Sequence, residues 1–400
     1  MRLWKNSKKD DESKGDNMRI LHTGDLHLDS AFCTYGYENA EMQRQSGRDL
    51  LTAIFKCAKD EKCDMLLIAG DLFDSRFVTS ESSELFCRLV GECGMPVIVS
   101  PGNHDWYSDD SFYAKVREKL GDRLTVFSSS DLQTFDFDDL KVRVFGYAFT
   151  SPVLTYSPLS DARIPNDNGY LKIFCGHADL ASPISRYAPV TLSEITALGV
   201  DYAALGHIHN RKEYEDSCGR VRYCGFAEGR SFDEVGEGGI WIVDIDAENC
   251  IAERRILSKK SFYVLNTDVS DCCSENDIER SICDTVKEYS KVKGAHIRVE
   301  LVGRADEKCV SAVALESDNI AKSNGIEYLE IVDGTLPGLD GEYLEKNTTL
   351  RGELYRTLLP KLMSDNADER RTATHALRIG LAAIDGKNVL SSYVQKRSKV

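Results

Sequence analysis

The feature that most constrains the fold is a series of short apolar segments that each end near a glycine and run into a polar loop. Five of them have the length and aliphatic content of buried strands: RILHT (19–23), MLLIAG (65–70), PVIVS (96–100), LKIFCGH (171–177) and DYAALGH (201–207). Segments with helical spacing, at about 38–59 and 79–92, separate the first three. This alternation predicts strands whose carboxyl ends carry loops at one edge of a sheet.

Further segments predict a second sheet. FDFDDLKVRVFGYAF (135–149) has the pattern of a hairpin with its turn at the paired aspartates, and 191–199 is typical of a short helix. VRYCGF (221–226) and GGIWIVDID (238–246) are interpreted as edge strands that close this sheet. The simplest packing is an α/β fold, a two-sheet sandwich flanked by helices.

The composition changes near residue 260. A helix at about 275–290 and strands at 295–303 and 328–334 predict a small α+β module, and 342–384 predicts two helices separated near 364–368. We therefore expect a domain over 18–258, an α+β module over 259–340 and a helical segment over 341–400. Residues 1–17 are polar and are interpreted as a disordered tail or an extension upstream of Met18.

Composition limits the class of protein. The 400 residues are 42% hydrophobic and 29% charged, and no apolar run is long enough to span a bilayer. Because the first 17 residues are polar and charged, we expect no signal peptide. The 13 cysteines include no CxxC pair, so we expect reduced thiols and a cytoplasmic protein. A net charge of −15 argues against a surface coated with positive charge. Residues 351–400 carry ten Lys or Arg against five Asp or Glu, which leaves open a solvated basic tail or a binding surface.

Polar residues with metal-binding chemistry follow the predicted strands. Five of the eight histidines lie in these loops, beside carboxylates and one amide, which are ligand types suited to manganese, iron or zinc. Two polar residues lie near the candidate ligands without being counted among them. His22 is interpreted as a buried structural residue, with support of a ligand as the alternative. Asp74 is interpreted as a residue that stabilises its own loop, with a role in catalysis as the alternative. The five motifs are GDLHL (24–28), GDLFD (70–74), GNHD (102–105), GH (176–177) and GHIH (206–209).

This ordered set of motifs, over residues 24–209, resembles the calcineurin-like metallophosphoesterase superfamily. The resemblance implies that Asp25, His27 and His209 hold one metal ion, and that Asn103, His177 and His207 hold a second. It also implies that Asp71 bridges both ions, as a carboxylate can between cations ~3.5–4 Å apart. His104 would approach the scissile phosphate, and Asp105 would orient and charge that imidazole. The implied activity is metal-dependent phosphoester hydrolysis.

Longer stretches resemble bacterial DNA-repair exonucleases of the SbcD and YhaO type. These stretches are HTGDLHLDSAF (22–32), IAGDLFDS (68–75), VSPGNHDWY (99–107) and LGHIHNR (205–211). The resemblance implies a DNA exonuclease or endonuclease with two divalent ions, manganese before iron or zinc, and a C-terminal capping module.

The same resemblance implies partners. They are DNA, an SMC-like ATPase of the SbcC or YhaN type, and a second copy of the chain in a homodimer. The helices over 342–384 would dock on the ATPase or pack on their own capping module; the sequence leaves both open. The alternatives are a phosphodiesterase or phosphatase for a small nucleotide or other phosphoester, motivated by the net acidity, and a non-catalytic scaffold.

Overall fold

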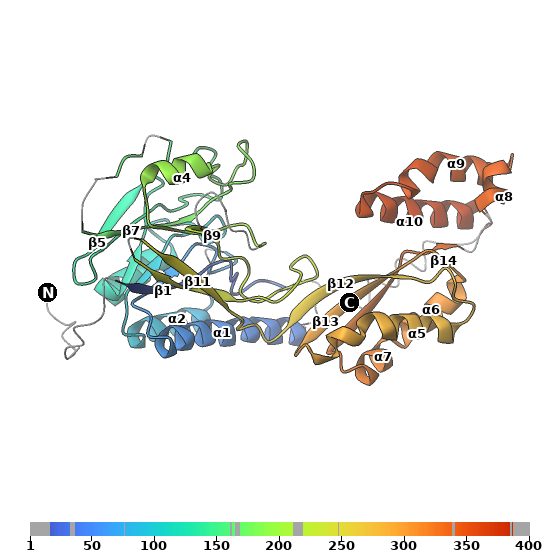
Figure 1. The fold of residues 1–400 in the computed structure, drawn as a ribbon, viewed down its shortest axis with the longest axis horizontal. Coiled ribbons are helices and arrows are strands. Elements are labelled where there is room, and N and C mark those ends of the chain that lie inside the picture. The colour runs from blue at the N-terminus through green and yellow to red at the C-terminus, as the bar shows by residue number, and fades with distance from the viewer. Residues whose placement is uncertain are drawn as a thin grey trace. The chain divides into compact units, whose positions relative to one another are not determined.

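A computed structural model describes residues 17–32, 37–75, 77–160, 162–164, 169–210, 219–246, 248–337, 341–384 and 386 (Figure 1). The chain divides into two compact units. The first runs to Ser258, and the second holds Lys259 onward. The second unit also includes the segment Gly229–Glu237, which the sequence pattern did not assign to it. No helix in these ranges is both long and apolar enough to cross a membrane.

The first unit contains a six-stranded sheet in the order β11-β10-β1-β2-β3-β4. The four strands from β1 to β4 are parallel, whereas β10 and β11 are antiparallel to their neighbours. The strands are β1 (Met18–Thr23), β2 (Met65–Ile68), β3 (Val97–Val99), β4 (Leu124–Val126), β10 (Ile240–Ile245) and β11 (Cys250–Arg255).

Three helices cover one face of this sheet, and α1 and α2 lie along it in Figure 1. They are α1 (Tyr37–Asp60), α2 (Ser80–Glu92) and α3 (Phe112–Leu120), which a short 3-10 turn (Gly121–Arg123) follows. Ile54, Phe86 and Val116 of these helices are buried in one cluster with Leu66 and Val97 of the sheet. Their helical spacing places the apolar side chains on one stripe, as the sequence predicted for α1 and α2.

The second sheet of this unit has the order β5-β6-β7-β8-β9. Val144, Cys175 and Ala204 of this sheet pack against Ile20 and Leu67 of the first. The helix α4 (Leu192–Leu198) packs on the outer face. The predicted two-sheet sandwich between helices is therefore confirmed. The strands are β5 (Gln133–Phe137), β6 (Val142–Gly146), β7 (Leu171–His177), β8 (Tyr202–Gly206) and β9 (Val221–Tyr223).

One strand assignment was wrong. The segment predicted over 238–246 forms β10, which lies inside the first sheet between β1 and β11, whereas it was expected at an edge of the second. The side chains of β10 are nearly all buried because both faces of this sheet are covered: Ile242 lies in the cluster under the helices, and Val243 lies in the cluster between the two sheets. The other predicted edge strand, β9, does lie at the edge of the second sheet.

Glycines let the two sheets approach closely where their carboxyl ends meet. A Cβ atom on Gly206 would lie 1.9 Å from the backbone oxygen of Ala69, and one on Gly70 would lie 2.3 Å from Nδ1 of His177. Gly70 also has a φ of +88°, a conformation that favours glycine. The loops that follow these strands therefore face each other at short range.

The second unit has a parallel sheet in the order β12-β13-β15, with helices on one face. Alternate residues of β13, Ile297, Val299 and Leu301, are buried against Ile278 and Ile282 of α5. The elements are β12 (Ser261–Asp268), α5 (Glu275–Val286), a 3-10 turn (Lys287–Lys291), β13 (Ala295–Val302), β14 (Arg304–Ala305), α6 (Glu307–Leu315), α7 (Ser317–Ser323), β15 (Tyr328–Asp333) and β16 (Leu336–Pro337).

Three C-terminal helices have a small core of their own, to which Leu354, Leu358, Leu362, Leu377 and Leu381 contribute. They are α8 (Gly341–Lys346), α9 (Leu350–Leu362) and α10 (Ala367–Ile384). Their link to the α+β module is ionic, since the guanidinium of Arg378 donates to both carboxylate oxygens of Asp333 at 2.6 and 2.7 Å. Leu350 is 69% exposed and Ile379 is 41% exposed.

Candidate two-metal centre

The predicted ligands lie on loops that follow strands of both sheets. Asp25, His27, Asp71 and His207 all have positive φ values, of 50°, 46°, 46° and 102°. Such backbone is rare for residues other than glycine and concentrates at functional sites. The left-handed turns redirect the chain at the strand ends, so that the polar side chains after each strand point toward one another.

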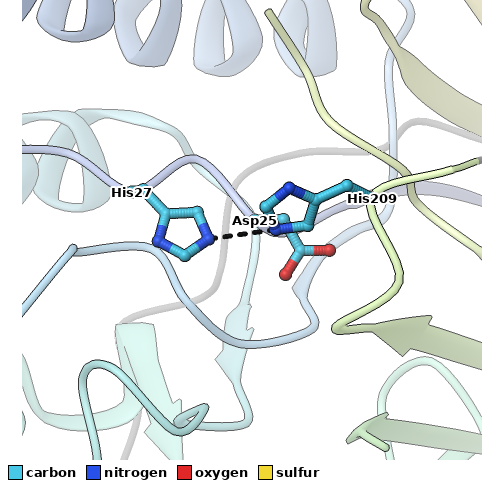
Figure 2. Close-up of side chains that lie close together, drawn as sticks. All are labelled: Asp25, His27 and His209. Carbon is cyan, nitrogen blue, oxygen red and sulfur yellow. Dashed lines mark hydrogen bonds between the residues drawn. The ribbon is translucent and has the colours of Figure 1, made fainter. Parts of the chain in front are cut away.

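The first group of converging side chains is Asp25, His27 and His209, whose ligand atoms lie within 4.8 Å of one another. Figure 2 shows the two imidazoles pointing toward each other beside the carboxylate. Their Nε2 atoms are 3.2 Å apart. Nδ1 of His27 lies 3.0 Å from Oδ1 of Asp74, and an ionised carboxylate only accepts hydrogen bonds. Nδ1 therefore carries the proton, and the lone pair of His27 Nε2 faces His209.

The second group lies around His177. Its Nδ1 donates to the backbone oxygen of Ala69 at 3.0 Å, so its Nε2 lone pair is directed the other way. That Nε2 lies 3.0 Å from Oδ1 of Asn103 and 3.3 Å from Oδ2 of Asp71. The ring of His207 lies beside it, with centroids 5.1 Å apart.

Asp71 lies between the two groups. Its Oδ2 is 3.3 Å from Nε2 of His177 and 3.8 Å from Nε2 of His27. Its Oδ1 accepts the backbone N–H of His104 at 2.9 Å, which fixes the orientation of the carboxylate. A single oxygen placed between two imidazole lone pairs is the geometry expected of a ligand shared by two cations.

These residues fit metal ions. Lone pairs of imidazole nitrogens, the Asn103 amide oxygen and the Asp71 carboxylate converge at distances where they repel one another unless a cation or proton lies among them. Nitrogen and oxygen ligands without a thiolate suit manganese, iron or zinc. The carboxylate and the carbonyl oxygen on the outer nitrogens of His27 and His177 are typical supports for metal-bound histidines.

The electrostatics show how strongly this cluster attracts positive charge. Burial by itself lowers the pKa of His177, but the carboxylates of Asp71 and Asp25 outweigh it and raise that pKa to about 9. Burial opposes ionisation of Asp71 as well, yet the imidazoles of His177, His27 and His104 hold its pKa well below the usual range. Burial, with the charge of His177, lowers the pKa of His207 to about 4. Without metal the cluster binds protons, which metal ions must displace.

The structure corrects the predicted partner of His104. Nδ1 of His104 donates to the backbone oxygen of Asp74 at 3.1 Å and lies 3.6 Å from the Oδ1 atom of Asp74. Asp105 instead accepts hydrogen bonds elsewhere, from the Gly102 N–H at 2.8 Å and the Tyr113 hydroxyl at 2.6 Å. The carboxylate beside His104 is therefore that of Asp74, while buried Asp105 anchors the loop that carries Asn103 and His104.

Some contacts of the site had no clear signal in the sequence. The thiol of Cys224 donates to Oδ2 of Asp25 at 3.3 Å, and the backbone N–H of His207 donates to both oxygens of that carboxylate at 3.0 and 3.1 Å. For Asp74 a signal did exist, because the GDLFD motif places a second carboxylate three residues after Asp71. The sequence pattern does not show that Asp74 reaches two histidines at once.

Comparison with known proteins identifies the class of this domain. The model of the calcineurin-like phosphoesterase family matches residues 18–211. These residues therefore form a calcineurin-like metallophosphoesterase domain, and the chain is a metal-dependent phosphoesterase. This fold binds a dinuclear metal site, consistent with the converging ligands described above.

Among individual relatives, the chain is 25% identical over 299 residues to the uncharacterized metallophosphoesterase YhaO of Bacillus subtilis, covering 72% of this chain and 71% of that protein. It is 23% identical over 288 residues to the SbcD component of the SbcCD nuclease of Staphylococcus epidermidis, covering 64% and 75%. It is 25% identical over 270 residues to the DNA double-strand break repair protein Mre11 of Aeropyrum pernix, covering 63% and 64%.

Proposed function

We propose that this chain is a two-metal-dependent DNA exonuclease or endonuclease of DNA repair. The observation that carries the proposal is the position of Asp71 Oδ2, which lies 3.3 Å from Nε2 of His177 and 3.8 Å from Nε2 of His27, one imidazole from each group of candidate ligands. In this proposal Asp71 is shared by both ions. Asp25, His27 and His209 hold the first ion, and Asn103, His177 and His207 hold the second.

The bound ions would supply Lewis acidity toward a phosphodiester and lower the pKa of water at the site. The chain itself supplies His104, whose side chain is 43% exposed and so accessible to substrate. Because Asp74 holds its Nδ1, the opposite nitrogen is directed away from Asp74. With a proton on each ring nitrogen, the imidazole would donate from Nε2 to a phosphate oxygen and then give that proton to the leaving oxygen, which leaves a neutral ring with its proton on Nδ1. We propose manganese as the native metal, before iron or zinc, because the resemblance to the SbcD-type exonucleases implies it; the mixed oxygen and nitrogen ligands suit all three.

DNA is favoured as the substrate because two of the similar proteins are named as a nuclease component and as a double-strand break repair protein. The test is hydrolysis of end-labelled linear DNA with Mn²⁺. We expect Asp71→Ala and His104→Ala to lower the rate by about 100-fold or more. His375→Ala, which changes a histidine of α10 outside the site, is the matched control and should retain the rate. Full activity in either site variant would contradict the proposal.

The net charge of −15 supports a second candidate, a phosphodiesterase or phosphatase for a small nucleotide or other phosphoester, because an acidic surface repels a polyanion. The two candidates separate on a panel of bis-nitrophenyl phosphate, cyclic nucleotides, and single- and double-stranded DNA at equal metal concentration. Hydrolysis of the small esters with DNA left intact would favour the second candidate.

We also propose that the C-terminal helices bind an SMC-like ATPase through the exposed side chains Leu350 and Ile379. Leucines of α9 and α10 already pack together, so these helices keep their own core while two apolar residues face solvent. Leu350→Glu and Ile379→Glu should abolish retention of an SMC-type ATPase encoded beside this chain. Leu315→Glu on α6, where the side chain is 85% exposed, is the matched control. Unchanged retention in the first two variants would refute this surface.

We also propose that the chain forms a homodimer, and light scattering of the purified chain should then give the mass of two copies. A cytoplasmic location accords with the cysteines, which are free thiols throughout the described part of the chain.

A further inference from the structure

The geometry of the proposed first metal ion depends on how the two sheets are aligned. Asp25 and His27 follow β1 of the six-stranded sheet, whereas His209 follows β8 of the five-stranded sheet. The Nε2 atoms of His27 and His209 are 3.2 Å apart, and a shift of β1 along β8 would change this distance. Metal–ligand distances tolerate errors of only about 0.2 Å, so a small slip between the strands would weaken binding.

A buried histidine joins these two strands. His22 lies on β1, has no exposed surface, and makes both of its ring hydrogen bonds to residues of β8. Its Nε2 donates to the backbone oxygen of Leu205 at 3.2 Å, because a carbonyl oxygen only accepts. Its Nδ1 therefore accepts the hydroxyl of Tyr202, at 2.9 Å. The pair of bonds defines one tautomer and one orientation of the ring.

The surroundings of this pair are apolar. Ile20 and Leu67 of the first sheet face Cys175 and Ala204 of the second in the same buried cluster. Apolar contacts are not directional, so they set the distance between the sheets more strongly than the alignment. A buried hydrogen bond is directional, and a slip that breaks it leaves a polar group unsatisfied, at a cost of about 1–3 kcal/mol. Burial lowers the pKa of His22 to about 3, so the ring stays neutral and keeps both bonds near neutral pH.

The proposed second ion has separate ties between the sheets. The hydroxyl of Ser100, next to the β3 loop, donates to the backbone oxygen of Tyr147 at 2.7 Å. Nδ1 of His177 on β7 donates to Ala69 beside β2 at 3.0 Å. Neither tie involves His22 or Tyr202. Loss of the His22 pair should therefore affect one metal ion more than the other.

We propose that His22 is a positioning residue for the metal centre: its bonds to Tyr202 and Leu205 align β1 with β8 and so hold His27 and His209 at one metal ion. This inference rests on the proposed two-metal function. It goes beyond that function because His22, which is not itself a proposed ligand, would support the first metal ion and not the second. His22 lies three residues before Asp25, and Leu205 lies four residues before His209, so the alignment passes into both loops that carry ligands of the first ion.

The test is calorimetric titration of the metal-free full chain with MnCl₂, in wild type and in Tyr202→Phe and His22→Leu. Wild type should bind two equivalents. We expect Tyr202→Phe to weaken one equivalent by about tenfold and to leave the other within about twofold, as for other residues that support metal ligands. His22→Leu should show the same selective loss. If His22→Leu does not fold, Tyr202→Phe still decides, because it removes one hydroxyl and keeps the ring.

A purely structural role predicts a different pattern. Val243→Ala opens a cavity in the same buried cluster, on β10, and removes no hydrogen bond of the His22 pair because the valine side chain has no polar atom. It should lower thermal stability while both equivalents bind as in wild type. If Tyr202→Phe binds each of the two Mn²⁺ equivalents with the same affinity as wild type, the positioning role is overturned. Failure of wild type to bind two equivalents would instead refute the proposed two-metal function.

Discussion

Replacement of Gly206 by alanine tests whether the close approach of the two sheets is required for the metal site. The new Cβ would lie 1.9 Å from the backbone oxygen of Ala69, and real Cβ atoms essentially never come closer than 3.0 Å. The backbone must therefore move by at least 3.0 − 1.9 = 1.1 Å. This displacement is several times the tolerance of about 0.2 Å for a metal–ligand distance. The contact is with backbone, so rotation of a side chain cannot relieve it.

The displacement should act on both proposed metal ions. Gly206 lies three residues before His209, a proposed ligand of the first ion. It also directly precedes His207, and the oxygen of Ala69 that must move accepts the hydrogen bond from His177, so the second ion is affected as well. We expect at least tenfold weaker binding of both Mn²⁺ equivalents and a loss of about 1–3 kcal/mol of stability from overpacking. Calorimetric titration of the metal-free chain measures the first effect, and denaturant unfolding with EDTA measures the second.

Gly199→Ala is the matched control, at the C-cap of α4 just before β8. Its φ is +66° and a Cβ there meets no atom within 4 Å, so alanine adds backbone strain of about 1 kcal/mol without a clash. This variant should lose stability but bind both metal equivalents normally. Wild-type metal affinity in Gly206→Ala would refute the reasoning, because it would show that the ligand loops do not depend on this sheet separation.

Other predictions concern single side chains. The pKa of His22 is lowered from 6.5 to about 3 by burial, with smaller contributions from Arg254 and Arg222, so the unfolded state binds an extra proton between these values. The contribution of His22 to the free energy of unfolding is therefore complete above pH 6.5 and is smaller by about 2 kcal/mol at pH 5. The free energy of unfolding of His22→Leu, measured with EDTA present, should lack this pH dependence. Tyr113→Phe removes the hydroxyl bonded to buried Asp105 and should cost about 1 kcal/mol of unfolding free energy; no change would show that this bond contributes nothing. Asp74→Asn should lower the rate of hydrolysis by at least about tenfold with both metal equivalents still bound, and an unchanged rate would remove Asp74 from the site.

The sequence predicted the local parts of this protein well. The strand-then-glycine segments are strands in the structure, and the polar residues after them meet at one place. This follows from physics that acts within a few residues: an apolar run forms a buried strand, and a glycine permits the turn that ends it. Because parallel strands bring their carboxyl ends to one edge, the motifs that follow strands of the same sheet were expected to lie together. That local argument does not predict how the two sheets pack, which brings the two sets of motifs to one place.

Long-range partners were predicted less well. Asp105 was expected beside His104, yet it lies buried against Tyr113, and Asp74 occupies the place beside the imidazole. Adjacent residues in a tight loop point in different directions, so proximity in sequence did not determine contact. The thiol of Cys224, far along the chain from Asp25, gave no signal because only the pairing of the sheets brings the two together.

The sequence by itself determined the types of candidate ligand, their order and the strands that present them, since these depend on composition and local periodicity. Only the tertiary structure decided that β10 enters the first sheet, which carboxylate faces His104, and that His22 joins β1 to β8. Each of these depends on how two surfaces distant in sequence align. That alignment arises from many weak packing contacts together with a few directional hydrogen bonds, and no local pattern encodes it.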